Sequence, residues 1–215
     1  MEAMSREEGL LPELEPYLTR KGFNHPLCIL AGSKLPFALI NGQVRQKAQG
    51  VREAIERANF SRAIFLHERI YRWVTLERYA RWYRGTIDPL LPALFREVWI
   101  DSDGIRRNEA SIASLVPLVE QRRREIMERA ADLAVYDSFA DRLTVFRGVC
   151  GRFNKGRSWT LSKEKAIGFA CRFCGGRSKV FARSVAKREV LFYSDERGEQ
   201  EVVLLAPVPG KVAKP

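Results

Sequence analysis

The sequence predicts an α+β protein in which a mainly helical N-terminal region, residues 1–140, precedes a compact mixed region, residues 141–215. Two observations predict this division. Apolar residues recur at intervals of three and four in much of the first region, which is the period of an amphipathic helix. After about residue 141, short runs rich in β-branched residues alternate with glycines, as in strands joined by turns. The composition, with 46% apolar and 29% charged residues, is that of a folded globular chain.

Helical spacing is clearest in residues 51–84, where acid-before-base pairs four residues apart add support. The spacing returns in residues 112–119, with Pro117 in a first turn or a kink, and residues 121–134 continue as a polar helix. No motif in residues 1–140 indicates chemistry. We therefore expect this region to recognise a target or to cover a binding cleft. Proline and glycine break the helical pattern at residues 88–89, 91–92 and 101–104.

The second region combines predicted strands with one predicted helix. Residues 163–173 carry Ala166, Phe169 and Ala170 at helical spacing. Ser158 to Thr160 is expected to be extended. The other predicted strands are residues 143–146, 179–185, 189–193 and 201–205.

The net charge of +11 is concentrated in the second region. Residues 1–140 hold 21 Lys and Arg against 19 Asp and Glu, whereas residues 141–215 hold 16 against 7. Between residues 142 and 188, 13 basic residues accompany a single acidic residue, Glu164. Scattered basic residues are usually solvated surface, but this surplus favours an anionic ligand such as a dinucleotide, a nucleic acid or an acidic protein.

The cysteines do not predict a metal site. Cys171 and Cys174 have CxxC spacing and Cys150 could join them, but zinc needs a fourth ligand, and His25 and His67 are distant in sequence. We expect no bound metal, and reduced, buried thiols. The four cysteines, too few for a disulfide scaffold in a chain of this length, are Cys28, Cys150, Cys171 and Cys174.

The sequence also favours production in the cytoplasm without a membrane association. No apolar run approaches the roughly 18 residues that a membrane-spanning helix needs. The N-terminal residues MEAMSREEGLLPELE are acidic and lack the basic and apolar segments of a signal peptide.

The two residues that close the first predicted strand of the second region suit an anionic ligand. The segment TVFRG, residues 144–148, ends in Arg147 and Gly148. Arginine offers a planar set of donors that matches a phosphate, and glycine lets a flat ligand approach the backbone. We expect the strand to end here, with the guanidinium at an edge of the sheet.

Two later segments place polar residues two apart. Ser158 and Thr160, in GRSWTLS, would point the same way on an extended segment. Glu199 and Glu201, in GEQEVVLL, would share one face of a strand, with their Cα atoms about 6.5–7 Å apart. Two carboxylates on one face destabilise each other unless a cation or hydrogen-bond donors lie opposite. Such a pair indicates either a functional site or a solvated edge.

In this order, the segments resemble the arginine–serine–glutamate branch of the ADP-ribosyltransferases, which includes cholera-toxin-like proteins and ecto-enzymes. They look particularly like short bacterial or phage-type members that read Arg-Gly…Gly-x-Ser-Trp-Thr…Ala-x-x-Phe-Ala. The resemblance covers about residues 143–206, a third of the chain. The family's arginine matches Arg147, its Ser-Thr-Ser matches Ser158-Trp159-Thr160, and its Glu/Gln-x-Glu matches Glu199-Gln200-Glu201. The departures are Trp159 and the short step of 11 residues from Arg147 to Ser158.

The resemblance implies a split β-sandwich over residues 141–215 that binds NAD as co-substrate, with no metal. Glu201 would be the catalytic carboxylate, bonded to the ribose 2′-hydroxyl and held by Ser158. Glu199 would orient the incoming nucleophile. The remaining implied roles concern NAD binding: Arg147 on phosphate and ribose, the Gly148 backbone on the nicotinamide amide, and Thr160 on the ribose or in support of the site.

The implied reaction transfers ADP-ribose from NAD to a macromolecule. Glu199 favours a protein arginine, because among relatives glutamate at that position tends to accompany arginine acceptors. The basic residues 142–188 favour RNA or DNA instead, and a small molecule is a third class of acceptor. The resemblance is also compatible with a toxin or effector delivered to a target cell and with a cognate inhibitor or antitoxin as partner.

Two readings without catalysis stay open. In the first, the basic residues and Arg122, Arg123 and Arg124 make a nucleic-acid-binding protein whose aromatic residues stack on bases. Such binding would weaken steeply with salt and would not respond to NAD. In the second, the chain is an inactive relative that serves as a scaffold. The aromatic residues concerned, most of them expected in the core, are Phe146, Phe153, Trp159, Phe169, Phe173 and Phe181.

Overall fold

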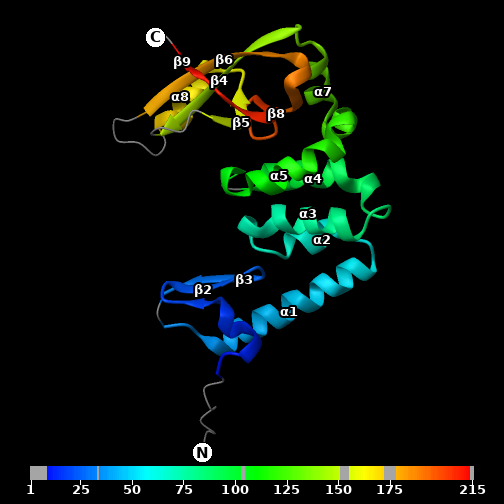
Figure 1. Cartoon of the computed structure of the whole chain (residues 1–215), viewed down its shortest axis with the longest axis vertical. Coiled ribbons are helices and arrows are strands. Elements are labelled where there is room, and N and C mark those ends of the chain that lie inside the picture. Colours follow the sequence, from blue (N-terminus) through cyan, green and yellow to red (C-terminus); the bar gives the residue numbers. More distant parts are fainter. Residues whose placement is uncertain (1–8, 33, 103–104, 151–154, 172–177, 214–215) are drawn as a thin grey trace, which may run out of the picture. The chain divides into compact units, whose positions relative to one another are not determined.

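The computed structural model describes residues 9–32, 34–102, 105–150, 155–171 and 178–213. The chain divides into two compact units, Met1–Ile112 and Ala113–Pro215, coloured from blue to green and from green to red in Figure 1. The division falls within α5 (Glu109–Val119), earlier than the change of pattern at residue 141. Residues 113–140 therefore belong to the same unit as the predicted strands.

The N-terminal unit begins with a small antiparallel sheet in the order β1-β2-β3, which the helical reading of this region did not include. Phe23 of β2 and Cys28 of β3 pack with Leu14 and with Ile40 of the first helix in an apolar cluster. Burying these side chains joins the sheet to the helix. The strands are β1 (Leu18–Thr19), β2 (Gly22–His25) and β3 (Cys28–Ala31).

The rest of the N-terminal unit is helical, as predicted, but its helices are shorter than the periodic pattern suggests. Trp73, Phe95 and Trp99 are fully buried, and their rings meet in edge-to-face and stacked pairs. The helices are α1 (Phe37–Glu56), α2 (Phe60–Phe65), α3 (Arg72–Trp82) and α4 (Leu91–Asp101), with 3-10 turns η1 (Pro12–Tyr17), η2 (Arg69–Tyr71), η3 (Asp88–Leu90) and η4 (Ile105–Asn108).

The C-terminal unit contains a six-stranded antiparallel sheet in the order β7-β8-β5-β4-β6-β9. This sheet and the helices confirm the α+β class, and each strand predicted in the second region is present. The strands are β4 (Arg142–Cys150), β5 (Lys155–Thr160), β6 (Ser178–Ala186), β7 (Val190–Ser194), β8 (Glu201–Pro209) and β9 (Lys211–Val212).

The middle of this sheet is weakly joined. Strands β4 and β6 pair along nine residues each, from Arg142 opposite Ala186 to Cys150 opposite Ser178. By contrast, the described residues of β4 and β5 share one residue pair, Phe146 opposite Thr160. This junction, called here the β4–β5 seam, separates β7-β8-β5 from β4-β6-β9.

Helices pack on both halves of the sheet. Helix α8 (Lys163–Cys171), which confirms the predicted helix, contacts β4, β5 and β6, whereas α6 (Arg123–Ile126) and α7 (Ala130–Asp137) contact β7. The polar helix predicted over residues 121–134 is instead divided between the 3-10 turn η5 (Glu120–Arg122), α6 and α7. A further 3-10 turn, η6 (Lys187–Glu189), precedes β7, and Pro117 lies inside α5.

The expectation of reduced, buried cysteines is correct only for Cys28, which is free and buried. Cys171 is free but exposed, and Cys150, at the exposed end of β4, is disulfide-bonded. Cys174 lies outside the described residues. Within the described ranges, no helix is long and apolar enough to cross a membrane, and no three His, Cys, Asp or Glu residues are grouped as metal ligands.

Candidate active site

The site is centred on a contact between neighbouring strands β5 and β8. Thr160 pairs with Glu201 and Ser158 pairs with Val203, so Ser158 and Glu201 share one face of the sheet. The Ser158 Oγ donates a hydrogen bond to Glu201 Oε1 at 2.5 Å. The Glu201 side chain is only 6% exposed. The structure thus brings together two of the residues that the sequence singled out, with the carboxylate nearly buried.

Arg147 reaches the same place from the other side of the β4–β5 seam. Its Nη1 donates a hydrogen bond to the carbonyl oxygen of Ser158 at 2.5 Å. Gly156 makes room, because a Cβ there would lie 2.5 Å from the Arg147 Cζ. The expected position at a sheet edge is wrong, since β4 continues to Cys150 between β5 and β6.

The Arg147 guanidinium is only partly satisfied within the protein. Burial lowers the pKa of Arg147, and the negative charge of Glu201 partly offsets this by raising it. The Arg147 Nε is buried and has no hydrogen-bond partner in the part of the chain that the structure describes. An unpaired buried donor is costly, so the described residues leave part of the hydrogen-bonding capacity of this guanidinium unused.

Gly148 is needed for packing. A Cβ at this position would lie 1.8 Å from the carbonyl oxygen of Ala166 and 2.6 Å from the backbone nitrogen of Ala170. Glycine therefore lets α8 lie directly on β4, beside Arg147. The role that the resemblance implies for the Gly148 backbone stays a prediction.

Glu199 does not lie on a strand, so the prediction that Glu199 and Glu201 share one face of a strand is wrong. β8 begins at Glu201, and Gln200 has a left-handed backbone with φ of 49°. Residues 195–200 form the turn between β7 and β8, called here the β7–β8 turn. Because the backbone turns at Gln200, the orientation of the Glu199 side chain is not set by the alternation of side chains along β8.

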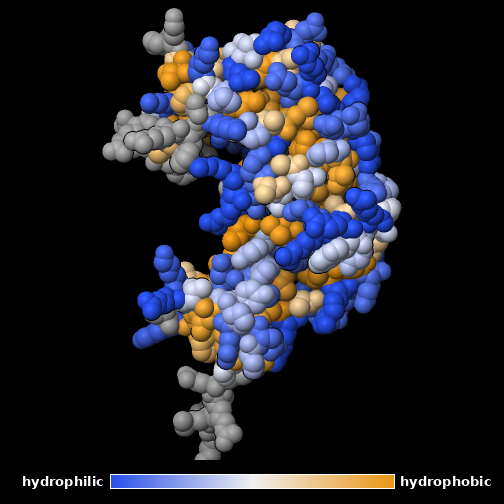
Figure 2. Space-filling view, in the orientation of Figure 1, coloured by the Kyte–Doolittle hydropathy of each residue, from blue (hydrophilic) through white to orange (hydrophobic). Residues whose placement is uncertain are grey.

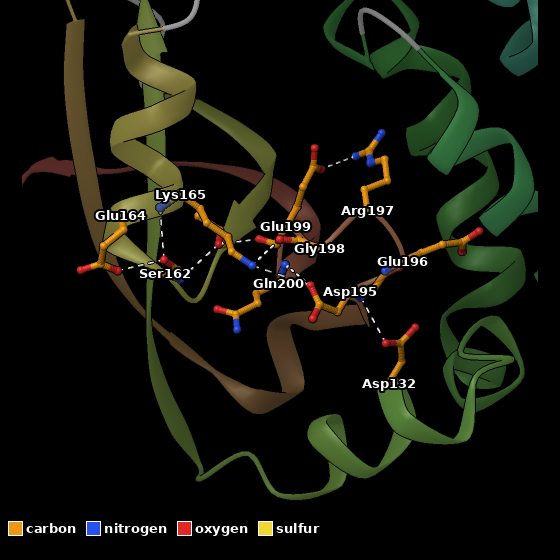
Figure 3. Close-up of polar contacts among 12 residues, drawn as sticks. Asp132, Ser162, Glu164, Lys165, Asp195, Glu196, Arg197, Gly198, Glu199 and Gln200 are labelled. Atoms are coloured by element: carbon orange, nitrogen blue, oxygen red, sulfur yellow. Dashed lines mark hydrogen bonds and ion pairs between the residues drawn. The ribbon is translucent and has the colours of Figure 1, made fainter.

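Side chains from several elements hold the β7–β8 turn in place (Figure 3). Within the turn, the Gln200 N–H donates to Asp195 Oδ1 at 2.8 Å. From outside, the Lys165 ammonium on α8 donates to the carbonyl oxygen of Gly198. On α7, Asp132 Oδ1 accepts from the Asp195 N–H at 3.1 Å. Residues 113–140 thus support the site as well as the fold.

Thr160 belongs to these supports. It is 3% exposed, and its hydroxyl donates to the carbonyl oxygen of Glu199 at 2.7 Å. The Thr160 Oγ1 also accepts a hydrogen bond from the Ser162 N–H at 3.1 Å. Of the two roles predicted for Thr160, this geometry favours support of the site.

Arg197 contacts both carboxylates of the candidate site, and the sequence reasoning gave it no role. Its Nη2 lies 2.8 Å from Glu199 Oε2 and 3.2 Å from Glu201 Oε2, and Figure 3 shows the Glu199 and Arg197 side chains pointing toward each other. This guanidinium is the cation that offsets the repulsion between the two carboxylates. Gly198 is one of the glycines between predicted strands, but the sequence carried no sign of where the Arg197 side chain would lie.

The basic surplus of residues 142–188 has a partly structural explanation. Of its ten described members, six donate hydrogen bonds to backbone carbonyls within the C-terminal unit. Others are exposed, and Figure 2 shows hydrophilic residues over much of the visible face of this unit. The six internal donors are Arg142, Arg147, Arg157, Lys165, Arg183 and Lys187.

Of the aromatic residues that the sequence singled out in the second region, Trp159 and Phe181 are core residues, whereas Phe146 and Phe169 are half-buried. Trp159 and Phe181 are 2% and 6% exposed, and the Trp159 indole N–H donates to the carbonyl oxygen of Gly156 at 2.9 Å. Phe153 and Phe173 lie outside the described residues. Trp159 and Phe181 are therefore too buried to stack on nucleic-acid bases.

No family model, curated protein or solved structure matches the chain. Residues and geometry therefore carry the functional conclusion. A guanidinium, a serine and a nearly buried carboxylate meet at the β4–β5 seam, and a second carboxylate is held beside them by an anchored turn.

Proposed function

We propose that the protein is an NAD-dependent ADP-ribosyltransferase that modifies arginine side chains of other proteins. One observation carries the proposal: Ser158 bonds Glu201 through its hydroxyl and Arg147 through its carbonyl oxygen. A carboxylate and a guanidinium are thereby held on two sides of one residue. This is the arrangement that cleavage of a dinucleotide at its ribose needs, with an anchor for phosphate beside a group that stabilises positive charge.

The donors of the site suit NAD. Arg147 would hold phosphate and ribose oxygens, because its planar guanidinium matches a phosphate and its hydrogen-bonding capacity is only partly used by the described residues. The sheet supports this assignment as well, because the β4–β5 seam divides the six strands into two groups of three. We infer that these groups are the two halves of a split β-sandwich.

Glu201 would act on the bond between the ribose C1′ and the nicotinamide nitrogen. As this bond breaks, positive charge develops on the ribose, as in glycoside cleavage. A carboxylate that is 6% exposed stabilises such a charge more effectively than one in water, because little solvent screens it. Ser158 would orient Glu201 toward the ribose 2′-hydroxyl. Nicotinamide leaves, and the acceptor nitrogen bonds to C1′.

The contacts of Arg197 support arginine as the acceptor. One of its nitrogens already lies within hydrogen-bonding distance of both Glu199 and Glu201. The pair of carboxylates is thus shaped to hold a guanidinium, and Glu199 is placed to accept the proton that the nucleophile loses. Nucleic-acid acceptors are less favoured, because much of the basic surplus is engaged internally and Trp159 is buried.

Release of nicotinamide from NAD tests the proposal. We expect the wild-type protein to release nicotinamide and Glu201→Gln to do so about 10²–10³-fold more slowly, the usual effect of removing one group that stabilises a transition state. Glu196→Gln is the matched control, because Glu196 is an exposed carboxylate of the same turn. Equal rates for the wild-type protein and Glu201→Gln would contradict the proposal.

The acceptor class is tested with labelled NAD and a cell lysate. We expect the labelled ADP-ribose to be attached to arginine side chains of lysate proteins. Protease should therefore remove the labelled macromolecules, whereas nuclease should not. Label removed by nuclease would instead assign RNA or DNA as the acceptor. Salt-sensitive nucleic-acid binding, together with no nicotinamide release, would favour a non-enzymatic binding protein.

We also propose that the N-terminal unit recognises the acceptor protein. Apolar side chains at the surface of a folded unit are stabilised by contact with a partner protein, because the contact removes them from water. In this unit Leu39 and Trp82 are 53% and 64% exposed.

A further inference from the structure

We infer that Arg197 is itself an acceptor, so that the protein transfers ADP-ribose from NAD to the guanidinium of Arg197 within the same chain. This inference rests on the proposed function. It concerns a residue for which neither the motif nor its spacing suggested a role.

The first support is the position of the Arg197 guanidinium. Its Nη2 is 2.8 Å from Glu199, the residue that would activate an acceptor, and 3.2 Å from Glu201, the residue that would stabilise the ribose. An arginine of another protein would have to occupy this same place. Arg197 therefore stands where the proposed reaction needs its nucleophile.

The second support is that this nucleophile is both accessible and held in place. The Arg197 side chain is 40% exposed, so a ribose can approach it. The next two residues are fixed, because Lys165 bonds the carbonyl oxygen of Gly198 and Thr160 bonds that of Glu199. Holding a reactant beside the reacting bond raises its effective concentration to values that a separate acceptor does not reach.

Other arginines of the C-terminal unit that pair with carboxylates lie elsewhere. Arg122 pairs with Glu125 at the start of α6, and Arg124 pairs with Asp137. Neither pair includes Glu199 or Glu201. Arg197 is thus distinguished from them by the carboxylates that it contacts.

The step balances with NAD as the co-reactant. The bond between the ribose C1′ and the nicotinamide nitrogen breaks, and nicotinamide leaves with the bonding electrons as a neutral molecule. A nitrogen of the Arg197 guanidinium forms the new bond to C1′. Its proton passes to the Glu199 carboxylate and then to solvent. The products are nicotinamide, a proton and an ADP-ribosylated Arg197.

The test uses the purified full-length protein and NAD alone, with nicotinamide release measured in parallel. Peptide mass spectrometry locates any ADP-ribose on the chain. We expect Arg197 to be the labelled residue, with a fractional rate of labelling that does not change when the protein is diluted tenfold. Arg197→Lys should lower labelling at least tenfold. Arg188→Lys, which changes an exposed arginine of the same unit, should leave it unchanged.

The outcomes separate the inference from the proposed function. Nicotinamide release without label on Arg197 would overturn the inference and leave the proposed function standing. Label on Arg197 whose fractional rate falls with dilution would overturn transfer within one chain. Absence of nicotinamide release would overturn both.

Discussion

The aromatic cluster of the N-terminal unit and the surroundings of Glu201 in the C-terminal unit are stabilised by different interactions. The N-terminal unit encloses an aromatic cluster, in which Trp73 and Phe95 meet edge to face with ring centroids 4.9 Å apart and Trp99 is 0% exposed. The C-terminal unit buries charge beside its apolar strands, and Arg157 and Glu201, taken as whole residues, are each 4% exposed. Aromatic burial stabilises a fold directly, whereas a buried charge is costly unless hydrogen bonds compensate it.

The compensation in the C-terminal unit is specific. Arg157 donates to the carbonyl oxygens of Leu204 and Leu205, where the register between β5 and β8 shifts. Glu201 accepts from Ser158 and pairs with Arg197. From this difference we expect that substitutions in the aromatic core of the N-terminal unit lower the free energy of unfolding. Substitutions around Glu201 should mainly change NAD binding and nicotinamide release. The following predictions test this contrast.

The largest effect is expected in the aromatic cluster. Trp99→Ala should lower the free energy of unfolding by about 3–5 kcal/mol, because it removes a fully buried ring and leaves a cavity. Trp82→Ala is the matched control, since Trp82 is 64% exposed and should change stability by less than about 0.5 kcal/mol. Denaturant unfolding measures both. Equal losses would contradict the assigned core.

Arg147→Lys should act on NAD instead. We expect NAD binding, measured by titration, to weaken roughly ten- to hundredfold, because lysine cannot reproduce the planar donors of the guanidinium. The loss of unfolding free energy should be smaller than for Trp99→Ala. Arg142→Lys, at an exposed position of the same strand, should bind NAD like the wild-type protein. If Arg147→Lys lowered the free energy of unfolding but left NAD binding unchanged, the contrast between the two units would be wrong.

Thr160→Val should affect both properties moderately. It keeps the shape of the side chain but removes the hydrogen bond to the carbonyl oxygen of Glu199. We expect a loss of about 1–2 kcal/mol in unfolding free energy and slower nicotinamide release, because the β7–β8 turn loosens. Thr144→Val, at an exposed position of β4, is the control. Wild-type release by Thr160→Val would show that the turn does not need this anchor.

The smallest effect is a pH dependence confined to the N-terminal unit, which holds both histidines of the chain. Burial lowers the pKa of His67 and of His25 below the ordinary 6.5. Below pH 6.5 the unfolded chain therefore binds protons that the folded chain does not, and stability should fall as pH decreases. Unfolding at about pH 7.5 and 5.5 measures this fall, and His67→Gln should reduce it. An equal fall in His67→Gln would contradict this assignment for His67.

The sequence predicted the C-terminal strands well, because short runs rich in β-branched residues occur there among turn-forming glycines. It did not predict the N-terminal sheet. Its strands are two to four residues long, and Cys28-Ile29-Leu30-Ala31 is a short apolar run that periodicity cannot assign. At the candidate site, the sequence singled out Ser158 and Glu201, which lie on paired strands and are hydrogen-bonded to each other. It did not reveal Arg197, because that contact depends on the left-handed Gln200 within a turn.

The central claim, that Ser158 and Glu201 act on NAD as one unit, is tested most directly by a double-mutant cycle. Nicotinamide release is measured for Ser158→Ala, for Glu201→Gln and for the double variant. If Ser158 works by orienting Glu201, the double variant should release nicotinamide about as slowly as Glu201→Gln alone. Losses that multiply would show that the two residues act independently and would contradict the account.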